Sequence, residues 1–274
     1  MCGDAVIDLY ERHAHAYDRD RGRSLRERAW LDRFLSRVPA GGTVLDLGCG
    51  MGEPIARHLL ERGHAVVGID ASASMIELCR TRFPAAEWLV ADMRTLDLGR
   101  RFDGVLAWDS LFHLGMEDQR GMFRRFAAHV RPGAPLMFTS GPAEGEAVGA
   151  YRGEPLYHAS LGPAEYERLL EANGFAVRAY VPEDPDCGGH TVWLATRDAE
   201  PPTRDAEPPP RSDHDIPSQR RARRLLRRHP PPGVPRSRRA CAPLDRQVES
   251  GRRSDLLLYG RSLLSQVARR VVED

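Results

Sequence analysis

The sequence contains no lysine, so apart from histidine every basic side chain is an arginine. We interpret this as a bias of the coding sequence rather than as a chemical requirement. Cysteine is also scarce. The five cysteines, at positions 2, 49, 79, 187 and 241, form no C-x-x-C pair. Their scatter argues against a disulfide framework or a zinc site and fits a reducing cytoplasm. We predict no metal centre.

Long apolar runs are missing as well. No run approaches the roughly 18 residues of a membrane span, and the charged N-terminus lacks the apolar core of a signal peptide. The sequence therefore predicts a cytoplasmic protein with no membrane partner. With 41% hydrophobic residues among 274, the chain can form a globular core, and its net charge of +1 implies no bulk polyanionic partner.

The charges and prolines are unevenly distributed. Residues 1–197 hold 23 Arg and 28 Asp plus Glu, a net charge of −5, whereas residues 198–274 hold 17 and 11, a net charge of +6. The second segment also contains 11 of the 21 prolines. Such a composition buries too little apolar surface to offset chain entropy. We predict a disordered Pro/Arg-rich tail over 198–253 and a short amphipathic helix over 254–274.

The most informative segment is 44–52, with the sequence VLDLGCGMG. An apolar run that breaks into glycines predicts a buried strand and a tight turn, in which a ligand can approach the backbone. Pro54 then suits the first turn of a helix that runs through Glu61. Strand, glycine turn and helix N-terminus together indicate a nucleotide-type cradle. The third glycine comes one position too early for the dinucleotide fingerprint, which disfavours an NAD-dependent oxidoreductase.

Strands and helices alternate after this turn, which predicts an α/β fold with a largely parallel sheet. We expect strands at 43–47, 65–69, 87–90, 102–108, 134–140, 175–181 and 190–196, and helices at 54–62, 72–82, 117–130 and 163–173. The last two strands lack a helix between them and can pair antiparallel. Residues 4–37 read as two helices broken near 21–23, with Ser24 and Glu27 as a capping box for the second.

Acidic residues stand at the ends of the first three predicted strands: Asp46, Asp70 and Asp92. In an open α/β sheet, ligands bind at the carboxyl ends of the strands. A carboxylate at Asp70 can accept hydrogen bonds from both ribose hydroxyls, although an Asp before a Ser is also an ordinary helix cap. The alternative for Asp92 is a loop residue that caps a turn.

The pattern D-x-G-x-G-x-G at 46–52, with Asp70 and Asp92 after it, resembles the motifs of class I S-adenosylmethionine (SAM)-dependent methyltransferases. The resemblance covers residues 1–197, whose layout is similar to that of small-molecule methyltransferases of a generic bacterial subgroup. It implies a Rossmann-like, doubly wound, mostly parallel seven-stranded sheet with an antiparallel final hairpin. It also implies a helical cover at 1–37 and a methyltransferase domain at 38–197.

The resemblance further implies that S-adenosyl-L-methionine is the cofactor. The glycines would let backbone amides approach its methionine moiety, and Asp46 would face its cationic side. An aspartate at the position of Asp92 would bind the adenine amino group. The residues expected to bind the cofactor are Asp46, Gly48, Cys49, Gly50, Gly52, Asp70, Ala71, Met75, Asp92, Met93, Asp109 and Tyr17.

Methyl transfer from SAM needs in-line positioning, and removal of a proton when the nucleophile is not anionic. His113, which follows the fourth strand, is a candidate general base because imidazole changes charge near neutral pH. The alternative is a structural histidine bonded to the backbone. His190, at the start of the last strand, is a second candidate. The segment 141–162, which includes His158, is long enough to form part of a substrate lid.

The chain lacks both the Asn/Asp-Pro-Pro-aromatic motif and the Pro-Cys nucleophile of nucleic-acid methyltransferases. We therefore predict an enzyme that methylates an O, N or S nucleophile of a small molecule. One alternative is a SAM-binding regulatory protein without turnover. Another is a nucleic-acid-binding protein that acts through Arg220–Arg228, although no aromatic residues there could stack on bases. The methyl acceptor and the oligomeric state stay open.

Overall fold

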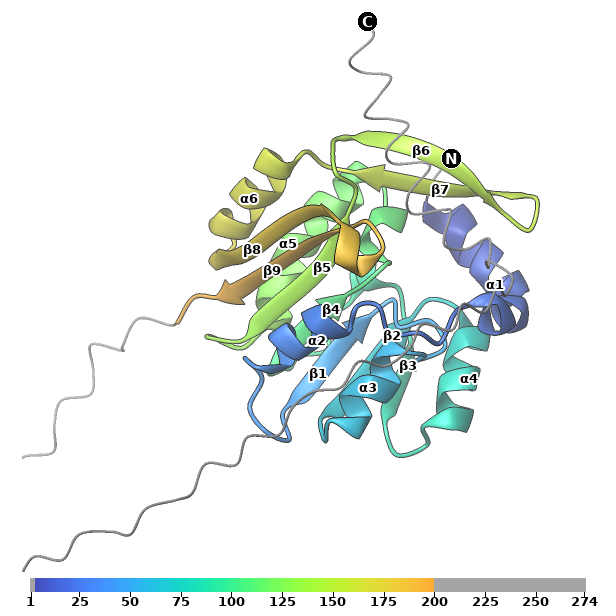
Figure 1. Cartoon of the computed structure of the whole chain (residues 1–274), viewed down its shortest axis with the longest axis horizontal. Helices are drawn as coiled ribbons and strands as arrows, with labels where there is room; N and C mark the ends of the chain where they lie inside the picture. Colours follow the sequence, from blue (N-terminus) through green and yellow to red (C-terminus); the bar gives the residue numbers. More distant parts are fainter. Residues whose placement is uncertain (1–2, 200–274) are drawn as a thin grey trace, which may run out of the picture. The chain divides into compact units, whose positions relative to one another are not determined.

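The computed structural model describes residues 3–199, whose arrangement is shown in Figure 1. The predictions made for residues 200–274, including the amphipathic helix and the arginine run, lie outside the described residues. Residues 200–253 of the tail that the sequence predicts to be disordered lie outside them too.

The centre of the fold is a seven-stranded sheet with the strand order β3-β2-β1-β4-β5-β9-β8. The first five strands pair in parallel, whereas β9 pairs antiparallel with both β5 and β8. This confirms the predicted fold class and the antiparallel final hairpin. The strands are β1 (Thr43–Leu47), β2 (Ala65–Asp70), β3 (Glu87–Val90), β4 (Gly104–Ala107), β5 (Pro135–Ser140), β8 (Phe175–Asp184) and β9 (His190–Arg197).

Helices cover both faces of this sheet. Leu45 and Val105 point to the face covered by α5 and α6, whereas Val44 and Leu106 point to the face covered by α2, α3 and α4. Burial on both faces explains why the central strands are continuous apolar runs. The helices are α1 (Gly3–Asp20), α2 (Arg28–Leu35), α3 (Ile55–Glu61), α4 (Ala73–Arg82), α5 (Met116–His129) and α6 (Pro163–Ala172).

Most predicted elements differ from the observed ones by only a few residues at their ends, but two features differ in kind. Residues 141–162, expected to be an insertion, contain a two-stranded antiparallel sheet of β6 (Gly145–Tyr151) and β7 (Glu154–Ser160). The capping box was wrong. Glu27 is itself the cap residue of α2 and makes no side-chain cap bond. It is instead within 3.4 Å of Arg21.

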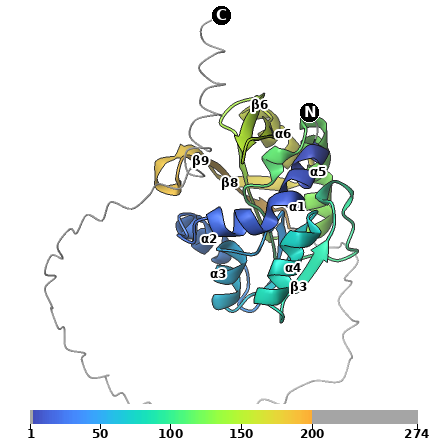
Figure 2. The ribbon, with the colours of Figure 1, turned by 90° about the vertical axis from the view of Figure 1, so that its right-hand side faces the viewer.

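Helix α1 lies across the carboxyl edge of the sheet, between α4 and the β6–β7 hairpin, as Figures 1 and 2 show. Glu11 accepts hydrogen bonds from the hydroxyls of Ser72 and Ser74 at the start of α4, at 2.6 and 2.7 Å. On the other side, Arg12 and His13 both bind Glu154 of β7. The N-terminal helix is therefore fastened to two parts of the chain that are far apart in sequence.

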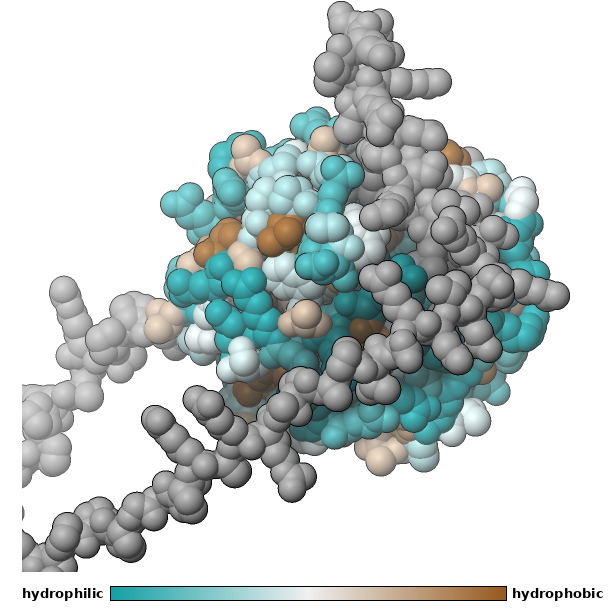
Figure 3. Space-filling view, in the orientation of Figure 1, coloured by the Kyte–Doolittle hydropathy of each residue, from teal (hydrophilic) through white to brown (hydrophobic). Residues whose placement is uncertain are grey.

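The surface of the described part is largely hydrophilic on the face seen in Figure 3, where hydrophobic residues are scattered. The exposed large hydrophobic side chains are Val90, Val148 and Val177. Among residues 3–199, no helix is long and apolar enough to cross a membrane.

Candidate functional site

Two neighbouring cavities lie at the carboxyl edge of the sheet, where the strand order reverses between β1 and β4. The smaller cavity, of about 110 Å³, lies over the ends of β1, β2 and β3. The larger cavity, of about 280 Å³, extends toward β9 and the β6–β7 hairpin. Most residues predicted to bind the cofactor line the smaller cavity: Gly48, Gly50, Asp70, Ala71, Met75, Asp92, Met93, Asp109 and Tyr17.

The glycine turn forms one wall of the smaller cavity. Gly48 and Gly50 have φ angles of +72° and +53°, in the left-handed region that favours glycine. A Cβ atom at Gly48 would lie 2.3 Å from the Cβ of Ser110, so the chain packs too tightly there for any side chain. At Gly50 no atom lies within 4 Å of the position a Cβ would take. The backbone of Gly50 is therefore open to a ligand.

Asp70 ties the glycine turn to the end of β2. Its carboxylate accepts one hydrogen bond from the amide of Gly50 and one from the amide of Ser72, both at 2.9 Å. The cap of α4 is Ser72, whose hydroxyl accepts from the amide of Met75 at 3.1 Å. A carboxylate can accept about four hydrogen bonds, so Asp70 retains capacity for a ligand. Burial raises the pKa of Asp70 above its usual value.

Asp92 both lines the smaller cavity and caps a turn, so the two interpretations of this residue coexist. Its carboxylate accepts from the amide of Arg94 at 2.8 Å and caps a short 3₁₀ helix that begins at Met93. The guanidinium of Arg94 also binds this carboxylate, at 2.6 to 3.1 Å. Met93 lines the same cavity.

Three residues of the predicted cofactor set do not line either cavity: Asp46, Cys49 and Gly52. Gly52 packs against Phe83, where an added Cβ would approach the ring to 3.0 Å. Asp46 is buried, with 3% of its surface exposed. Burial, and then the negative charge of Asp70, raise the pKa of Asp46 to about 7. Asp46 thus lies behind the glycine turn, close enough to Asp70 for the two carboxylates to repel each other.

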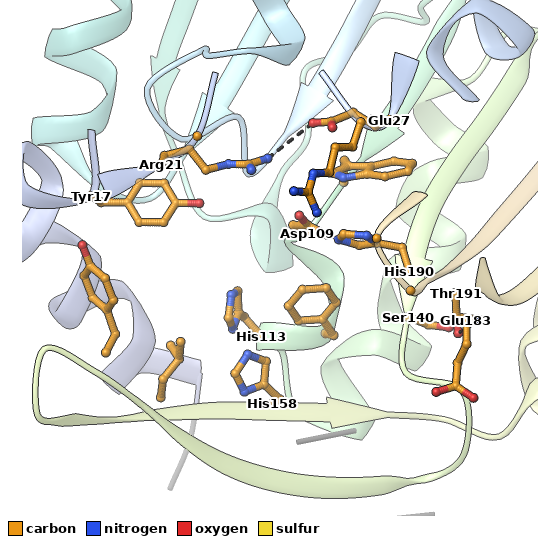
Figure 4. A pocket seen from close by; sticks show the side chains of 18 of the residues that line it. Tyr17, Arg21, Glu27, Asp109, His113, Ser140, His158, Glu183, His190 and Thr191 are labelled. Carbon is orange, nitrogen blue, oxygen red and sulfur yellow. Dashed lines mark hydrogen bonds and ion pairs between the residues drawn. The ribbon is translucent and has the colours of Figure 1, made fainter. Parts of the chain in front are cut away.

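Tyr10, Tyr17, Asp109 and His113 line both cavities and form what we call the shared wall. Figure 4 shows Tyr17, Asp109 and His113 of this wall. The larger cavity beside it is lined by aromatic rings, including Trp108, Phe112 and Tyr151. The tyrosines at positions 10 and 17 come from α1, whereas Asp109 and His113 follow β4. Four residues from two distant segments therefore separate the cavities.

The hydrogen bonds of His113 fix its tautomer. Its Nδ1 lies 3.1 Å from the carbonyl oxygen of Tyr157, which can only accept, so Nδ1 carries the proton. Its Nε2 is then an acceptor and faces the hydroxyl of Tyr10 at 3.3 Å. Burial lowers the pKa of His113 below its usual value, so the imidazole is neutral at pH 7. His113 thus offers an unprotonated nitrogen at the shared wall.

His190 has a different electrostatic environment. Its Nε2 lies 3.0 Å from Oδ1 of Asp109, and its Nδ1 lies 2.6 Å from the carbonyl oxygen of Cys187. The charge of Asp109 raises the pKa of His190 to about 11. Burial alone would raise the pKa of Asp109, but the charge and hydrogen bond of His190, together with the charge of Arg21, outweigh burial and hold that pKa at about 2. The pair is therefore ionised at neutral pH.

Sequence reasoning missed several residues that complete this region. Thr139 of β5 accepts from the amide of Asp109 at 2.8 Å. Tyr10 was recognised only as part of the helical cover. His158, expected in a lid, stacks beside His113 with ring centroids 4.9 Å apart, and burial lowers its pKa to about 3. The dipeptide Arg152-Gly153, which forms the two-residue turn between β6 and β7, was the available signal for the hairpin that carries it.

Comparison with known proteins agrees with this geometry. Residues 44–133 match the family model described as a methyltransferase domain. A dTDP-3-amino-3,6-dideoxy-alpha-D-glucopyranose N,N-dimethyltransferase of Streptomyces fradiae is 36% identical over 129 residues, or 46% of this chain and 49% of that protein. A trans-aconitate 2-methyltransferase of Azoarcus sp. is 36% identical over 115 residues, covering 40% and 44%. The chain spans about half the length of these relatives.

Solved structures share the fold. CalS10, an amino pentose methyltransferase from Micromonospora echinaspora, superposes with a TM-score of 0.54 at 23% identity, covering 67% of this chain and 95% of that one. The CcbJ methyltransferase of Streptomyces caelestis gives 0.55 at 20% identity, covering 69% and 96%. The chain therefore has the fold of these methyltransferases, and its residues 44–133 match a methyltransferase domain.

Proposed function

We propose that the protein is a SAM-dependent methyltransferase that acts on a small molecule. The observation that carries this proposal is the meeting of two cavities at the switch point of the sheet. One cavity has the open glycine turn and strand-end carboxylates, and the other has aromatic walls. A methyl donor in the smaller cavity would face an acceptor in the larger one across the shared wall. The relatives' activities support a small-molecule acceptor.

The smaller cavity fits SAM by its chemistry. The open backbone at Gly50 suits close approach of the ligand, and the free acceptor capacity of Asp70 suits a ribose diol. Asp92 and the backbone at Met93 would bind the adenine, with Ala71 and Met75 lining the cavity. Tyr17 and Asp109 would close its other end.

We assign Asp46 a long-range electrostatic role, since it lies behind the turn rather than in the cavity wall. Asp46 and Asp70 together would favour a cationic ligand, because a positive charge nearby would relieve the repulsion between the two carboxylates. Cys49 and Gly52 would act through the shape of the turn. When bound, SAM would supply a methyl group activated by a sulfonium.

His113 is the proposed general base. It is neutral, its acceptor nitrogen is fixed by the bond from Nδ1 to Tyr157, and it stands where an acceptor would meet the methyl group. His190, the second candidate, is protonated at neutral pH and cannot accept a proton there. We propose that His190 acts instead as a positioning residue that keeps Asp109 ionised.

The helical cover at 1–37 and the domain at 38–197 belong to the same proposal. Helix α1 supplies Tyr10 and Tyr17 to both cavities and is fastened to α4 through Glu11. Release of α1 would therefore open both cavities together.

Calorimetry with SAM and S-adenosylhomocysteine tests the cofactor, and transfer of a labelled methyl group from SAM to fractionated small-molecule extracts tests the activity. We expect saturable binding of both compounds and a labelled product. A chain truncated after residue 199 should behave alike if residues 200–274 have no part in the chemistry. Loss of nucleic-acid affinity on that truncation, with no binding of SAM by the full chain, would instead favour the nucleic-acid-binding alternative.

A further inference from the structure

The shared wall carries one formal charge, and that charge is negative. Its four residues are the phenols Tyr10 and Tyr17, the neutral imidazole His113 and the carboxylate Asp109. Aromatic faces and a carboxylate are the groups that proteins use to bind cations. The point where methyl transfer would occur is therefore built to stabilise positive charge.

One oxygen of Asp109 is open for a ligand. His190 lies 3.0 Å from Oδ1, and Thr139 donates to the same oxygen at 3.4 Å. Among the described residues no hydrogen bond or ion pair reaches Oδ2, although Asp109 borders both cavities. Figure 4 shows Asp109 between His190 on one side and Tyr17 and His113 on the other. The ion pair thus fixes the carboxylate through one oxygen and leaves the other for hydrogen bonding.

Cations near Asp109 lie toward the larger cavity. His190 and Arg21 border that cavity and not the smaller one. Arg21 is held within 3.4 Å of Glu27, a buried carboxylate whose charge offsets its own. Arg26 and Glu183 line this cavity too, so three cations stand against three carboxylates there. The balance is neutral overall, and the negative member of the His190 pair is the one that forms the shared wall.

The charge changes of methyl transfer distinguish the possible nucleophiles. A phenolate, carboxylate or thiolate approaches as an anion, which the carboxylate of Asp109 repels. An aliphatic hydroxyl must lose a proton, and a neutral imidazole with a lowered pKa is a poor base for so weak an acid. An amine attacks while neutral and becomes cationic, so Asp109 and the phenol rings stabilise its transition state more than its ground state.

We propose, building on the methyltransferase function proposed above, that the methyl acceptor is an amine whose nitrogen binds at the shared wall between Asp109 and His113. An N–H of the amine donates to Oδ2 of Asp109. The nitrogen lone pair forms the new N–C bond as the C–S bond breaks and its electron pair stays on sulfur. The resulting ammonium gives one proton to Nε2 of His113, and that proton then passes to water.

Three isosteric probes test this without knowledge of the natural acceptor: benzylamine, benzyl alcohol and benzoate. Their binding is measured calorimetrically on the full chain saturated with S-adenosylhomocysteine, which leaves the place of the methyl group vacant. We expect benzylamine to bind about tenfold or more tightly than benzyl alcohol, and benzoate to bind most weakly. Benzylamine that binds no more tightly than benzyl alcohol would overturn the proposal.

The variant Asp109→Asn then tests whether Asp109 causes the preference for benzylamine. This variant should lose most of the preference for benzylamine over benzyl alcohol. Asp186→Asn is the matched control, because it removes one carboxylate from an exposed residue that lines neither cavity. The control should keep the full preference. An equal loss in both variants would contradict the assignment to Asp109. The comparison of probes on the unaltered chain decides the acceptor class even if Asp109→Asn fails to fold.

A turnover assay distinguishes the amine-acceptor proposal from the methyltransferase function on which it rests. With labelled SAM and a panel of amines, alcohols, phenols, thiols and carboxylic acids, we expect labelled products only from amines. Labelled products only from alcohols, phenols, thiols or carboxylic acids would overturn the amine proposal but would still support a methyltransferase. Failure to bind either SAM or S-adenosylhomocysteine would remove the proposed function itself.

Discussion

The two cavities are assembled in different ways. In the smaller cavity, the hydrogen bonds that fix the wall join residues within about one βαβ unit of the chain. Asp70 binds Gly50 and Ser72, and Asp92 binds Arg94. In the larger cavity, they connect distant segments, such as Tyr10 with His113 and Asp109 with His190. A site made from neighbouring residues can be recognised as a motif, whereas a site made from distant ones cannot.

The two cavities also differ in their electrostatics. Burial raises the pKa values of Asp46, behind the smaller cavity, and of Asp70, in its wall. At the partly exposed Asp109, the positive charges of His190 and Arg21 instead lower the pKa to about 2. Asp46 and Asp70 therefore favour a cationic ligand in the smaller cavity, whereas Asp109 is held by His190 through Oδ1 and offers Oδ2. The following variants separate these two roles.

The largest expected effect is on turnover. His113→Gln should lower kcat by about 10²- to 10⁴-fold, because it removes the proposed base. Affinity for S-adenosylhomocysteine should change far less. The measurement is release of S-adenosylhomocysteine with an acceptor identified in the extract screen, compared with calorimetric binding. His64→Gln, at the other end of β2, is the control. A variant at position 113 with full turnover would exclude the base assignment.

Next in size is the loss of cofactor affinity at Asp70. Asp70→Asn should weaken binding of S-adenosylhomocysteine by about tenfold or more, because it removes an ionised hydrogen-bond acceptor. Calorimetry gives the dissociation constant. Asp97→Asn, at an exposed residue beyond β3 that lines neither cavity, should bind normally. Similar affinities in the two variants would argue against a ribose contact at Asp70.

A smaller effect concerns stability and pH. The pKa of Asp46 is about 7 in the folded chain and near its ordinary value when unfolded. Between those values the folded state holds a proton that the unfolded state has lost, so stability falls as pH rises and levels off above pH 7. Through Asp46 alone, the free energy of unfolding should fall by about 2 kcal/mol from pH 5.5 to 8. Urea unfolding of the ligand-free chain should show the decrease.

Asp46→Asn should reduce that pH dependence. His190 should add to the decrease above about pH 6.5, because its raised pKa keeps it protonated in the folded chain while the unfolded chain loses that proton. Asp109 should not contribute between pH 5.5 and 8, because its lowered pKa affects stability only as pH falls below the ordinary range of a carboxyl toward 2. An unchanged slope in Asp46→Asn would place the titration elsewhere.

The smallest expected effect is on the attachment of α1. Glu11→Ala removes the hydrogen bonds to Ser72 and Ser74 at an exposed position, which should cost about 1 kcal/mol. Hydrogen exchange of residues 3–20 should become faster, with modest weakening of both cofactor and acceptor binding. Asp8→Ala, an exposed residue of the same helix, serves as the control. An effect on one cavity alone would show that α1 does not close both.

The apolar runs of the sequence predicted the sheet well, because the central strands are buried on both faces and glycines such as Gly48 and Gly50 mark where a strand ends. They failed at the β6–β7 hairpin, whose residues are half-buried and follow no continuous apolar run. They also misassigned Glu27, whose side chain pairs with Arg21 rather than capping a helix. Tertiary packing overrides local preference at such positions.

The sequence alone determined the fold class and the place of the nucleotide-type cradle, because strand burial and left-handed glycines depend on residues close together in the chain. Only the tertiary structure decided the chemistry across the shared wall. The neutral tautomer of His113 depends on Tyr157, and the charge of His190 depends on Asp109. Hydrogen bonds and Coulomb interactions between residues so far apart in the sequence form only when the chain has folded.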